Sequence, residues 1–466
     1  MACNTVLEAL LDALGEDVVQ FGERIAYRRN ADWSGVPAAQ PLAVLCPRTT
    51  QQVSQALAIC HEYRQPVVVQ GGLSGLAGAA CTQEHDIALS LERMNVIEEI
   101  DEVSGTMTVQ AGAILQTVQE RAAAIGMMFP LDLGARGSCT IGGNLGSNAG
   151  GNRVIKYGMV REQVLDLEAV LADGRIIGGL RKMVKNNTGF DLKNLLIGSE
   201  GTLGIITRAV LRLRPQPAAV ATACCGLADY DSVTALLCTA QQRLASGVSA
   251  FEVMWPGYYN YVLANISGLK PPLPAQHNYY VLLESMGTEP ERQQADFERL
   301  LQECLETGVI EDAAVATTQR DALDFWSVRD APAEFPVLMP KLIAFDVSFS
   351  IRDIGQAAQD CAAGLGARWP GCTVLVYGHL GDGNLHLIVD VPGAAAETVE
   401  QVEALVYGLV NEYNGSVSAE HGIGLKKRNV LGLTRSASDL DAMRAIKLAL
   451  DPHDILNRGK VLPDRY

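Results

Sequence analysis

The feature that most constrains the fold is a pair of apolar segments within residues 374–391, which flank Gly381-Asp382-Gly383-Asn384. An Asp-Gly pair between apolar runs predicts a β-hairpin. If those four residues form the loop, His379 lies opposite His386, and directly opposed side chains share one face about 5 Å apart. Two imidazoles at that spacing can bind one metal ion. Glu420 and His421 form a second tight motif, which would have to reach the same place from elsewhere in the chain.

Length and composition exclude several classes of protein. A chain of 466 residues is longer than one core usually supports, so we expect at least two domains. The formal net charge of −16 makes nucleic acid a poor partner, because phosphate binding needs cationic surface. The 11 cysteines include no Cys-x-x-Cys pair, which favours reduced, mostly buried thiols over a disulfide framework or a zinc ribbon.

The sequence predicts a cytoplasmic protein. Its first residues lack a basic start and carry Glu8 and Asp12 within an apolar pattern, which favours an amphipathic helix over a signal peptide. The longest uncharged apolar runs, 215–228 and 253–269, are short or interrupted. A membrane span needs about 20 apolar residues, so we expect no transmembrane segment.

Three segments are rich in glycine, namely residues 70–78, 132–151 and 194–206. Glycine is costly to order, so such runs indicate that the backbone closely approaches a ligand or another segment. Successive free N–H groups in a turn of this kind suit a phosphate, although a tight turn is the simpler alternative. The second segment contains Ile141 and Leu145, which argue against a solvated linker. We interpret it as a backbone cradle for a large ligand with polar edges.

The order of predicted elements indicates an α+β chain in three parts. Residues 1–216 form the first domain, and a boundary is expected near Pro215-Gln216-Pro217. Residues 217–415 alternate helix and strand patterns, which predicts a second domain with an antiparallel sheet. Residues 416–466 form a C-terminal segment that returns to the first domain and the site. Predicted strands include 67–69, 106–110, 164–171, 248–254 and 343–350, and predicted helices include one capped by Thr50 and one over 231–244.

Taken together, the glycine-rich segments resemble the FAD-binding domain of vanillyl-alcohol-oxidase-type flavoproteins, above all DLGARGSCTIGGNLGSNAGG and GSEGTLGIIT. The motifs GHLGDGNLH, SAEHGIGLKKR and DPHDILNRGKVL narrow the resemblance to the FAD-linked D-2-hydroxy-acid dehydrogenases. That subgroup includes D-lactate and D-2-hydroxyglutarate dehydrogenases and the glycolate oxidase catalytic subunit. The resemblance covers nearly the whole chain and is weakest before residue 40 and over 217–320. It implies an FAD-binding domain of two subdomains and an α+β substrate domain with an antiparallel sheet.

The resemblance implies that FAD is the cofactor. In covalent relatives a histidine follows the paired glycines of the first loop, and Leu73 holds that place here, so the flavin is expected to be non-covalent. The residues implied to contact FAD are Gly71, Gly72, Leu73, Ser74, Gly75, Leu76, Gly137, Ser138, Ile141, Gly142, Asn144, Ser147, Asn148, Gly150, Gly151, Gly204, Ile206, Glu420 and Asn457.

The resemblance makes His379, His386 and Glu420 the ligands of one divalent metal ion, with Zn²⁺ favoured and Mn²⁺ or Co²⁺ as alternatives. Two imidazoles and a carboxylate leave an open position for a substrate. His421 is then the base that takes the proton of the 2-hydroxyl group while the hydride moves to flavin N5. A zinc hydrolase would leave the glycine-rich segments unexplained, and a satisfied polar residue in a core is the simpler alternative for each histidine.

Arg329 resembles the arginine that binds the substrate carboxylate in the family, and Asn384 is expected to contact the substrate. Hydroxyglutarate-type relatives carry extra polar side chains for the distal carboxylate of their substrate. The corresponding places here hold Ala333, Ala344 and Ile388, with Lys341 nearby. This difference favours D-lactate or larger apolar D-2-hydroxy acids without excluding the diacid.

The leading interpretation is an FAD- and metal-dependent dehydrogenase of small D-2-hydroxy acids. The alternatives are a flavin-binding subunit of a glycolate-oxidase-like complex that is inactive alone, and a non-catalytic metal-binding protein. The sequence has no nicotinamide-binding fingerprint and no cysteine ladder for iron–sulfur clusters. Electrons would therefore pass to a separate acceptor, such as an electron-transfer flavoprotein, a quinone or oxygen. The oligomeric state stays open, with a homodimer as one option.

Overall fold

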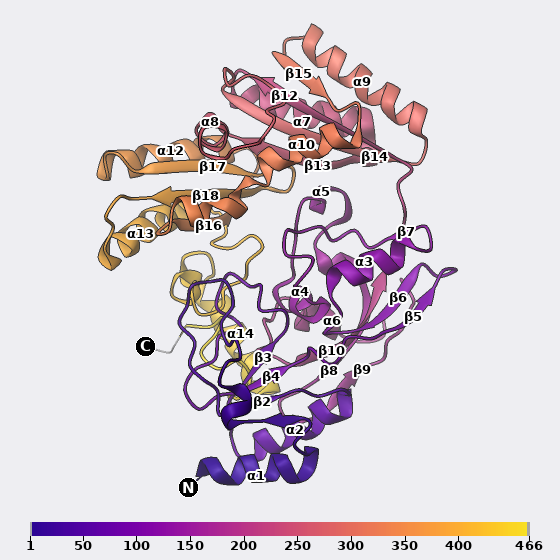
Figure 1. Ribbon diagram of the computed structural model, residues 1–466, viewed down its shortest axis with the longest axis vertical. Helices are drawn as coiled ribbons and strands as arrows, with labels where there is room; N and C mark the ends of the chain where they lie inside the picture. Colours follow the sequence, from indigo (N-terminus) through magenta and orange to yellow (C-terminus); the bar gives the residue numbers. More distant parts are fainter. Residues whose placement is uncertain (1, 464–466) are drawn as a thin grey trace. The chain divides into compact units, whose positions relative to one another are not determined.

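The chain forms two compact units in a computed structural model that describes residues 2–463 (Figure 1). The first unit comprises the chain up to Gly150, residues 158–216 and the chain from Glu420 onward. The second unit comprises residues 151–157 and 217–419. Of the predicted C-terminal segment, residues 416–466, the part from Glu420 onward belongs to the first unit and residues 416–419 belong to the second. The sequence did not indicate that residues 151–157 belong to the second.

The first unit contains two main sheets, each with its own hydrophobic core. The strand order is β1-β2-β4-β3 in one sheet, where β2, β4 and β3 are parallel, and β5-β6-β10-β8-β9 in the other, which is antiparallel. The strands are β1 (Val19–Gln20), β2 (Ala43–Leu45), β3 (Val67–Gln70), β4 (Ile87–Ser90), β5 (Ile97–Asp101), β6 (Thr106–Gln110), β7 (Met127–Met128), β8 (Val164–Val170), β9 (Ile176–Gly178), β10 (Ile205–Arg212) and β11 (Arg214–Pro215). The helices are α1 (Ala2–Leu14), α2 (Thr50–Glu62), α3 (Leu115–Ala123), α4 (Ile141–Ser147), α6 (Leu192–Leu196) and α14 (Ala437–Leu450).

The second unit is built on one seven-stranded antiparallel sheet with the order β15-β12-β14-β13-β17-β18-β16. Its strands are β12 (Ala219–Leu227), β13 (Val248–Met254), β14 (Tyr279–Gly287), β15 (Asp312–Val315), β16 (Ile343–Ser348), β17 (Thr373–His379) and β18 (Asn384–Asp390). Its helices are α5 (Val154–Tyr157), α7 (Tyr230–Leu244), α8 (Pro256–Asn265), α9 (Pro290–Glu306), α10 (Gln319–Arg329), α11 (Phe335–Leu338), α12 (Ile354–Arg368) and α13 (Ala396–Glu412). Among the described residues, we find no helix that combines the length and the apolar character needed to cross a membrane.

The predicted hairpin is present as β17 and β18, but its predicted register is wrong. Tyr377, not His379, lies opposite His386. The connection is longer than the four predicted residues, because a 3-10 turn over Leu380–Asp382 precedes Gly383, which has a φ of 85°. The register differs by two residues, and side chains alternate between faces with a period of two. Both histidines therefore still point to the same face of the sheet.

That face also carries carboxylates from the two strands that border the hairpin. Glu252 of β13 lies opposite His379, and Asp346 of β16 lies opposite His386. Helices α8 and α10 pack on the same face, where Tyr258 and Val328 share a core cluster with Tyr377 and Ile388. A row of polar side chains thus crosses a face that is otherwise apolar.

In the first unit, the turn that follows Glu420 and His421 is anchored by Glu200. The N–H groups of Ile423 and Gly424 donate to the two carboxylate oxygens of Glu200 at 2.7 and 2.8 Å. Gly422 has a φ of 79°, and a Cβ atom there would lie 2.8 Å from the carboxyl carbon of Glu200. The N–H of Leu425 donates to the carbonyl oxygen of Ala77 at 3.0 Å. The turn is therefore held by both the third and the first glycine-rich segments.

Burial raises the pKa of Glu200 to about 7, although the two N–H donors and the charges of Lys427 and Lys460 act in the opposite direction. The carboxyl group is 7% exposed, so water contributes little to stabilising its charge. Folding therefore favours the protonated form of Glu200 at mildly acidic pH.

The variant Glu200→Gln should remove a pH dependence from the stability of the protein. The folded-state pKa of Glu200 lies above its ordinary value of 4.5. The stability that the protonated carboxyl group contributes is therefore fully present below pH 4.5. This contribution is lost as the pH rises through 7, and it amounts to about 3 to 4 kcal/mol at about 1.4 kcal/mol per pKa unit. The melting temperature of the wild type should therefore fall relative to that of Glu200→Gln between about pH 5 and about pH 8.

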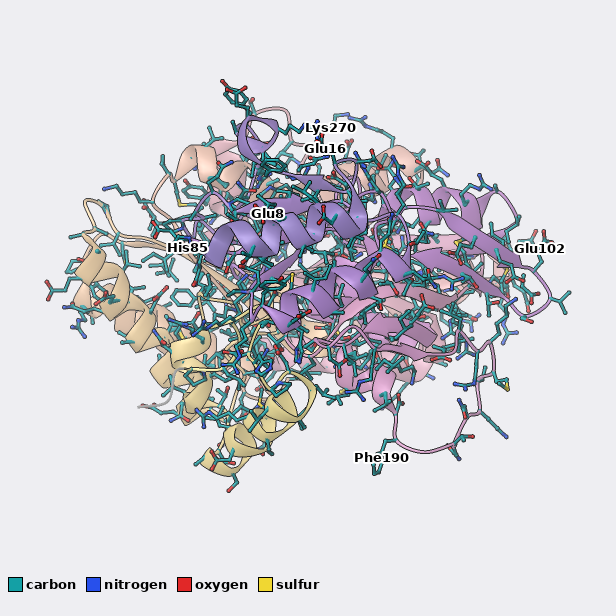
Figure 2. The ribbon with its side chains drawn as sticks, turned by 90° about the horizontal axis from the view of Figure 1, so that it is seen from below. Glu8, Glu16, His85, Glu102, Phe190 and Lys270 are labelled. Atoms are coloured by element: carbon teal, nitrogen blue, oxygen red, sulfur yellow. The ribbon has the colours of Figure 1, made fainter. Side chains whose placement is uncertain are left out.

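The exposed side chain of Glu8 on α1 provides the control for the loss of one carboxylate, as Glu8→Gln (Figure 2). If the difference between the melting temperatures of the wild type and Glu200→Gln stays constant over this pH range, the raised pKa of Glu200 is contradicted.

Candidate active site and cofactor cradle

The first glycine-rich segment follows directly from β3 and presents a series of free backbone donors. Within the described residues, the N–H groups of residues 71–76 donate to no acceptor, and these residues are exposed or half-buried. Leu73 adopts the left-handed conformation with a φ of 53°. Such a run of unpaired N–H groups suits an anion such as the pyrophosphate of FAD. The segment predicted to bind FAD thus fits that role.

The paired glycines of this segment have a structural reason of their own. A Cβ atom on Gly72 would lie 1.9 Å from the carbonyl oxygen of Ser138, and one on Gly71 would lie 2.5 Å from Oγ1 of Thr140. The first and second glycine-rich segments therefore contact each other backbone to backbone. Any larger residue at these two positions would separate the segments.

The second glycine-rich segment contains a helix that the sequence did not predict. The seven residues of α4 begin after Thr140, whose Oγ1 accepts the N–H of Gly143 at 3.4 Å. The N–H groups of Ile141 and Gly142 donate to the carbonyl oxygens of Ala113 and Ala111. A Cβ on Gly142 would lie 2.7 Å from that of Ala111. These contacts stabilise a helix in a sequence of low helix propensity.

Several polar residues predicted to contact FAD make their contacts within the protein. Nδ2 of Asn144 donates to Sγ of Cys139, Oγ of Ser147 donates to the carbonyl oxygen of Gly143, and Oδ1 of Asn148 accepts the N–H of Arg161. Asn457 is 2% exposed and accepts the N–H of Val69 while donating to the carbonyl oxygens of Ala79 and Glu200. Their side chains thus hold the cradle together, and direct contact with FAD stays a prediction.

The remaining residues predicted to contact FAD in the second and third glycine-rich segments are Gly137, Ser138, Gly150, Gly151, Gly204 and Ile206. Gly204 packs against Leu196, since a Cβ there would lie 3.1 Å from Cδ2 of that leucine, and Ile206 is buried in β10. Gly137 and Ser138 are exposed at the start of the second segment. Gly150 ends the first stretch of the first unit, and Gly151 begins the short stretch that belongs to the second unit.

The predicted metal ligands offer donor atoms that lie close together. The rings of His379 and His386 have centroids 5.3 Å apart. Glu420 directly follows Ala419, whose N–H donates to the carbonyl oxygen of Asp346, the residue opposite His386. Each of His379, His386 and Glu420 offers a ligand atom, and these atoms all lie within 4.8 Å of one another. Two nitrogen donors and a carboxylate suit Zn²⁺ and related divalent ions.

Arg329, at the end of α10, reaches the same face of the sheet and is 7% exposed. Its Nε donates to Glu252 Oε2 at 2.8 Å, and its Nη2 lies 3.1 Å from Nε2 of His379. The guanidinium carbon lies 5.2 Å from the ring centroid of Tyr377. Because Nε is occupied by Glu252, a substrate carboxylate would have to bind through Nη1 and Nη2.

Asn384 presents a buried acceptor at this site. Its Nδ2 donates to Oδ1 of Asp346 at 2.9 Å and to the carbonyl oxygen of Val347 at 3.0 Å. Both partners are acceptors, so the amide cannot be flipped, and Oδ1 has to face away from them. This oxygen is buried and has no hydrogen-bond partner among the described residues. An orphaned acceptor beside the histidines suits a ligand that carries an O–H group.

Three carboxylates of this arrangement were not identified from the sequence, namely Glu200, Glu252 and Asp346. Glu252 and Asp346 each interrupt an apolar strand and are 1% exposed. Burial alone would raise the pKa of Glu252, but the charges of His379 and Arg329 outweigh it and hold the pKa below its ordinary value. A charged residue inside an apolar strand pattern is the signal that could have identified both strand residues.

Comparisons with known families and proteins give matches over most of the chain. Residues 41–178 match an FAD binding domain, and residues 216–461 match the C-terminal domain of FAD linked oxidases. The chain is 37% identical over 453 residues to the mitochondrial D-2-hydroxyglutarate dehydrogenase of Arabidopsis thaliana. The aligned residues cover 97% of this chain and 80% of that relative. The chain is also 36% identical over 437 residues to the D-2-hydroxyglutarate dehydrogenase of Xanthomonas citri pv. viticola, and this alignment covers 92% of this chain and 91% of that relative.

The solved structures show the fold. p-Cresol methylhydroxylase has a TM-score of 0.78 at 17% identity, and the comparison covers all of this chain and 98% of that one. 4-Ethylphenol oxidase from Gulosibacter chungangensis has a TM-score of 0.75 at 18% identity. The predicted fold class, a vanillyl-alcohol-oxidase-type FAD-binding domain joined to an α+β domain with an antiparallel sheet, is thereby confirmed.

The same comparisons contradict the prediction of a cytoplasmic protein. The Arabidopsis relative and a Bos taurus relative, 38% identical over 435 residues, are both mitochondrial D-2-hydroxyglutarate dehydrogenases. The prediction rested on the lack of a long apolar run and of a basic start, and the relatives named as mitochondrial overturn it. With matched domains over most of its length and relatives above 30% identity, the chain belongs to the FAD-linked D-2-hydroxy-acid dehydrogenase family.

Proposed function

We propose that the protein oxidises a D-2-hydroxy acid to the 2-oxo acid with the help of a divalent metal ion. The observation that carries the proposal is the group formed by His379, His386 and Glu420, whose ligand atoms lie within 4.8 Å of one another. Arg329 and the orphaned Oδ1 of Asn384 accompany the two histidines. A cation, an acceptor and a metal-binding group are the parts that recognition of a 2-hydroxy carboxylate requires.

Each residue has one role in this proposal. Arg329 binds the substrate carboxylate through Nη1 and Nη2, which fixes the acid end of the substrate. Asn384 accepts a hydrogen bond at Oδ1, which helps to orient the hydroxyl end. His421, next to Glu420 and held by the turn that Glu200 anchors, takes the hydroxyl proton as the general base. Zn²⁺, Mn²⁺ or Co²⁺ at His379, His386 and Glu420 would supply a Lewis acid that makes this proton more acidic.

When bound, FAD supplies the acceptor for the substrate hydride at N5. Residues 71–76 would contribute backbone donors for its pyrophosphate, and the second and third glycine-rich segments would complete the cradle. Electrons would leave the reduced protein to a separate acceptor, such as an electron-transfer flavoprotein or a quinone.

The flavin should be non-covalent, because Leu73 occupies the place where a histidine would be linked to it. Denaturing the purified protein with acid should release all of the yellow colour into the supernatant. Colour that stays with the precipitated chain would show a covalent bond and contradict this expectation.

Removal of the metal should abolish turnover while FAD stays bound, since Glu420 is the one residue assigned to both the metal and FAD and the other residues of the two sets differ. The measurement is the rate at which the purified single chain reduces a dye acceptor with D-2-hydroxy acids, before and after chelation, with the flavin absorbance recorded in parallel. Added Zn²⁺ or Mn²⁺ should restore the rate. Unchanged turnover in protein verified to be metal-free would refute the Lewis-acid role, and a single chain without any activity would favour a dependent subunit.

The substrate should carry an apolar side chain. Ile388 lies two residues beyond His386, is 6% exposed and pairs with Ala344 on β16, while Lys341 is exposed to solvent. A second carboxylate placed against Ile388 would lose its hydration without gaining a partner. In a panel of D-2-hydroxy acids, kcat/KM for D-lactate or a larger apolar acid should exceed that for D-2-hydroxyglutarate by at least about tenfold, or about 1.4 kcal/mol.

The variant Ile388→Asn should narrow this difference, because an amide can donate to the second carboxylate. Ile388→Leu keeps the apolar character and is the matched control. A wild type that prefers D-2-hydroxyglutarate would contradict the proposed substrate class without affecting the proposed reaction.

A further inference from the structure

We propose that Glu252 and Asp346 are positioning residues that orient the two metal-binding histidines and thereby set the affinity of the site for its metal ion. The inference rests on the proposed function, because it presupposes that His379 and His386 bind the metal. Neither carboxylate belongs to the ligand group, and each lies beside a different histidine on the same face of the sheet.

Glu252 determines the tautomer of His379. Its Oε1 lies 2.7 Å from Nδ1 of His379 while Oε2 accepts from Arg329, and a carboxylate paired in this way can only accept at that distance. Nδ1 must therefore carry the proton. Nε2 is left with its lone pair, and Nη2 of Arg329 lies 3.1 Å from Nε2 and 3.3 Å from Nδ1. A metal ion needs this lone pair, so His379 is prepared for binding before any metal arrives.

The same carboxylate couples the metal ligand to the substrate anchor. Oε2 of Glu252 accepts Nε of Arg329 at 2.8 Å while Oε1 holds His379. Glu252, Arg329 and His379 are each at most 7% exposed, so the positions of all three are interdependent. Loss of the charge of Glu252 would therefore disturb both the metal ligand and the group that binds the substrate carboxylate.

Asp346 acts on His386 in a looser way. Its Oδ1 lies 3.8 Å from Nδ1 of His386, which is within the range of an ion pair and beyond that of a hydrogen bond. The same oxygen accepts Nδ2 of Asn384, and the backbone carbonyl of Asp346 accepts the N–H of Ala419, which precedes Glu420. Asp346 thus positions the side chain of Asn384 and the backbone that leads to Glu420. It also places a negative charge near His386.

Another buried carboxylate of this sheet, Glu284, makes hydrogen bonds to side chains other than the two histidines. Glu284 of β14 is 6% exposed and accepts from Oγ of Ser249 and Nε1 of Trp326. It contacts neither histidine in these interactions, so Glu284→Gln removes a buried charge from the same sheet without touching a metal ligand. It is the matched control for Glu252→Gln and Asp346→Asn.

The test measures the dissociation constant for Zn²⁺ of the full-length, FAD-loaded protein after chelation, by competition with a chromophoric chelator. Glu252→Gln should weaken Zn²⁺ binding by about 10- to 100-fold, because the glutamine amide can donate to Nδ1 and so favour the tautomer with the proton on Nε2. Asp346→Asn should weaken it less, and Glu284→Gln should leave it unchanged. At saturating metal, Glu252→Gln should also raise KM for the hydroxy acid by more than Asp346→Asn does, since only Glu252→Gln removes the anchor of Arg329.

The outcomes separate the two proposals. Wild-type protein that binds no Zn²⁺ or Mn²⁺ would overturn the proposed metal site itself. If a folded Glu252→Gln variant binds Zn²⁺ as tightly as the wild type does, only the positioning role of Glu252 is overturned. Should the variants fail to fold, ¹⁵N spectra of histidine-labelled, metal-free wild type decide the question. The signal that is lost in His379→Gln should report a neutral ring protonated at Nδ1, and protonation at Nε2 would refute the inference.

Discussion

The arrangement of the second unit depends on one buried carboxylate, that of Glu252. Burying a charge is costly unless it is paired and hydrogen-bonded, and Glu252 is paired with both Arg329 and His379. Removing any one of the three would leave an uncompensated polar or charged group in a face of the sheet packed by α8 and α10. The side chains proposed for metal and substrate binding are therefore held in place by electrostatics as well as by packing.

The first unit depends on a different constraint, which is contact between backbones. Gly71 and Gly72 leave no room for a Cβ against Thr140 and Ser138, and Gly424 leaves none against the carbonyl oxygen of Ala77. These contacts bring the glycine-rich segments together with the turn after His421, and over residues 2–463 the N–H groups of residues 71–76 find no acceptor. Glycine thus serves two purposes here, close packing between segments and free donors for an anion.

Comparison of the predicted and observed elements shows where local patterns suffice. The strands over 106–110 and 248–254 were predicted with their observed bounds, and the helix over 231–244 begins one residue earlier, because alternation and helical periodicity are local properties. The cap of α2 is Thr49 and not Thr50, a difference of one residue at a boundary. Helix α4 was missed, because it is stabilised by hydrogen bonds to Ala111 and Ala113, which are distant in sequence.

The sequence alone determined the hairpin, the face shared by its two histidines, the glycine-rich cradle and the family resemblance. All of these follow from short patterns, and even a wrong register preserved the shared face because strand side chains repeat every two residues. Only the tertiary structure decided that Tyr377 lies opposite His386, that Glu252 and Asp346 lie beside the histidines, and that Glu200 anchors the turn after His421. These neighbours come from strands and turns separated by tens to hundreds of residues, and their pairing depends on strand order and on the burial of charge, which no local pattern specifies.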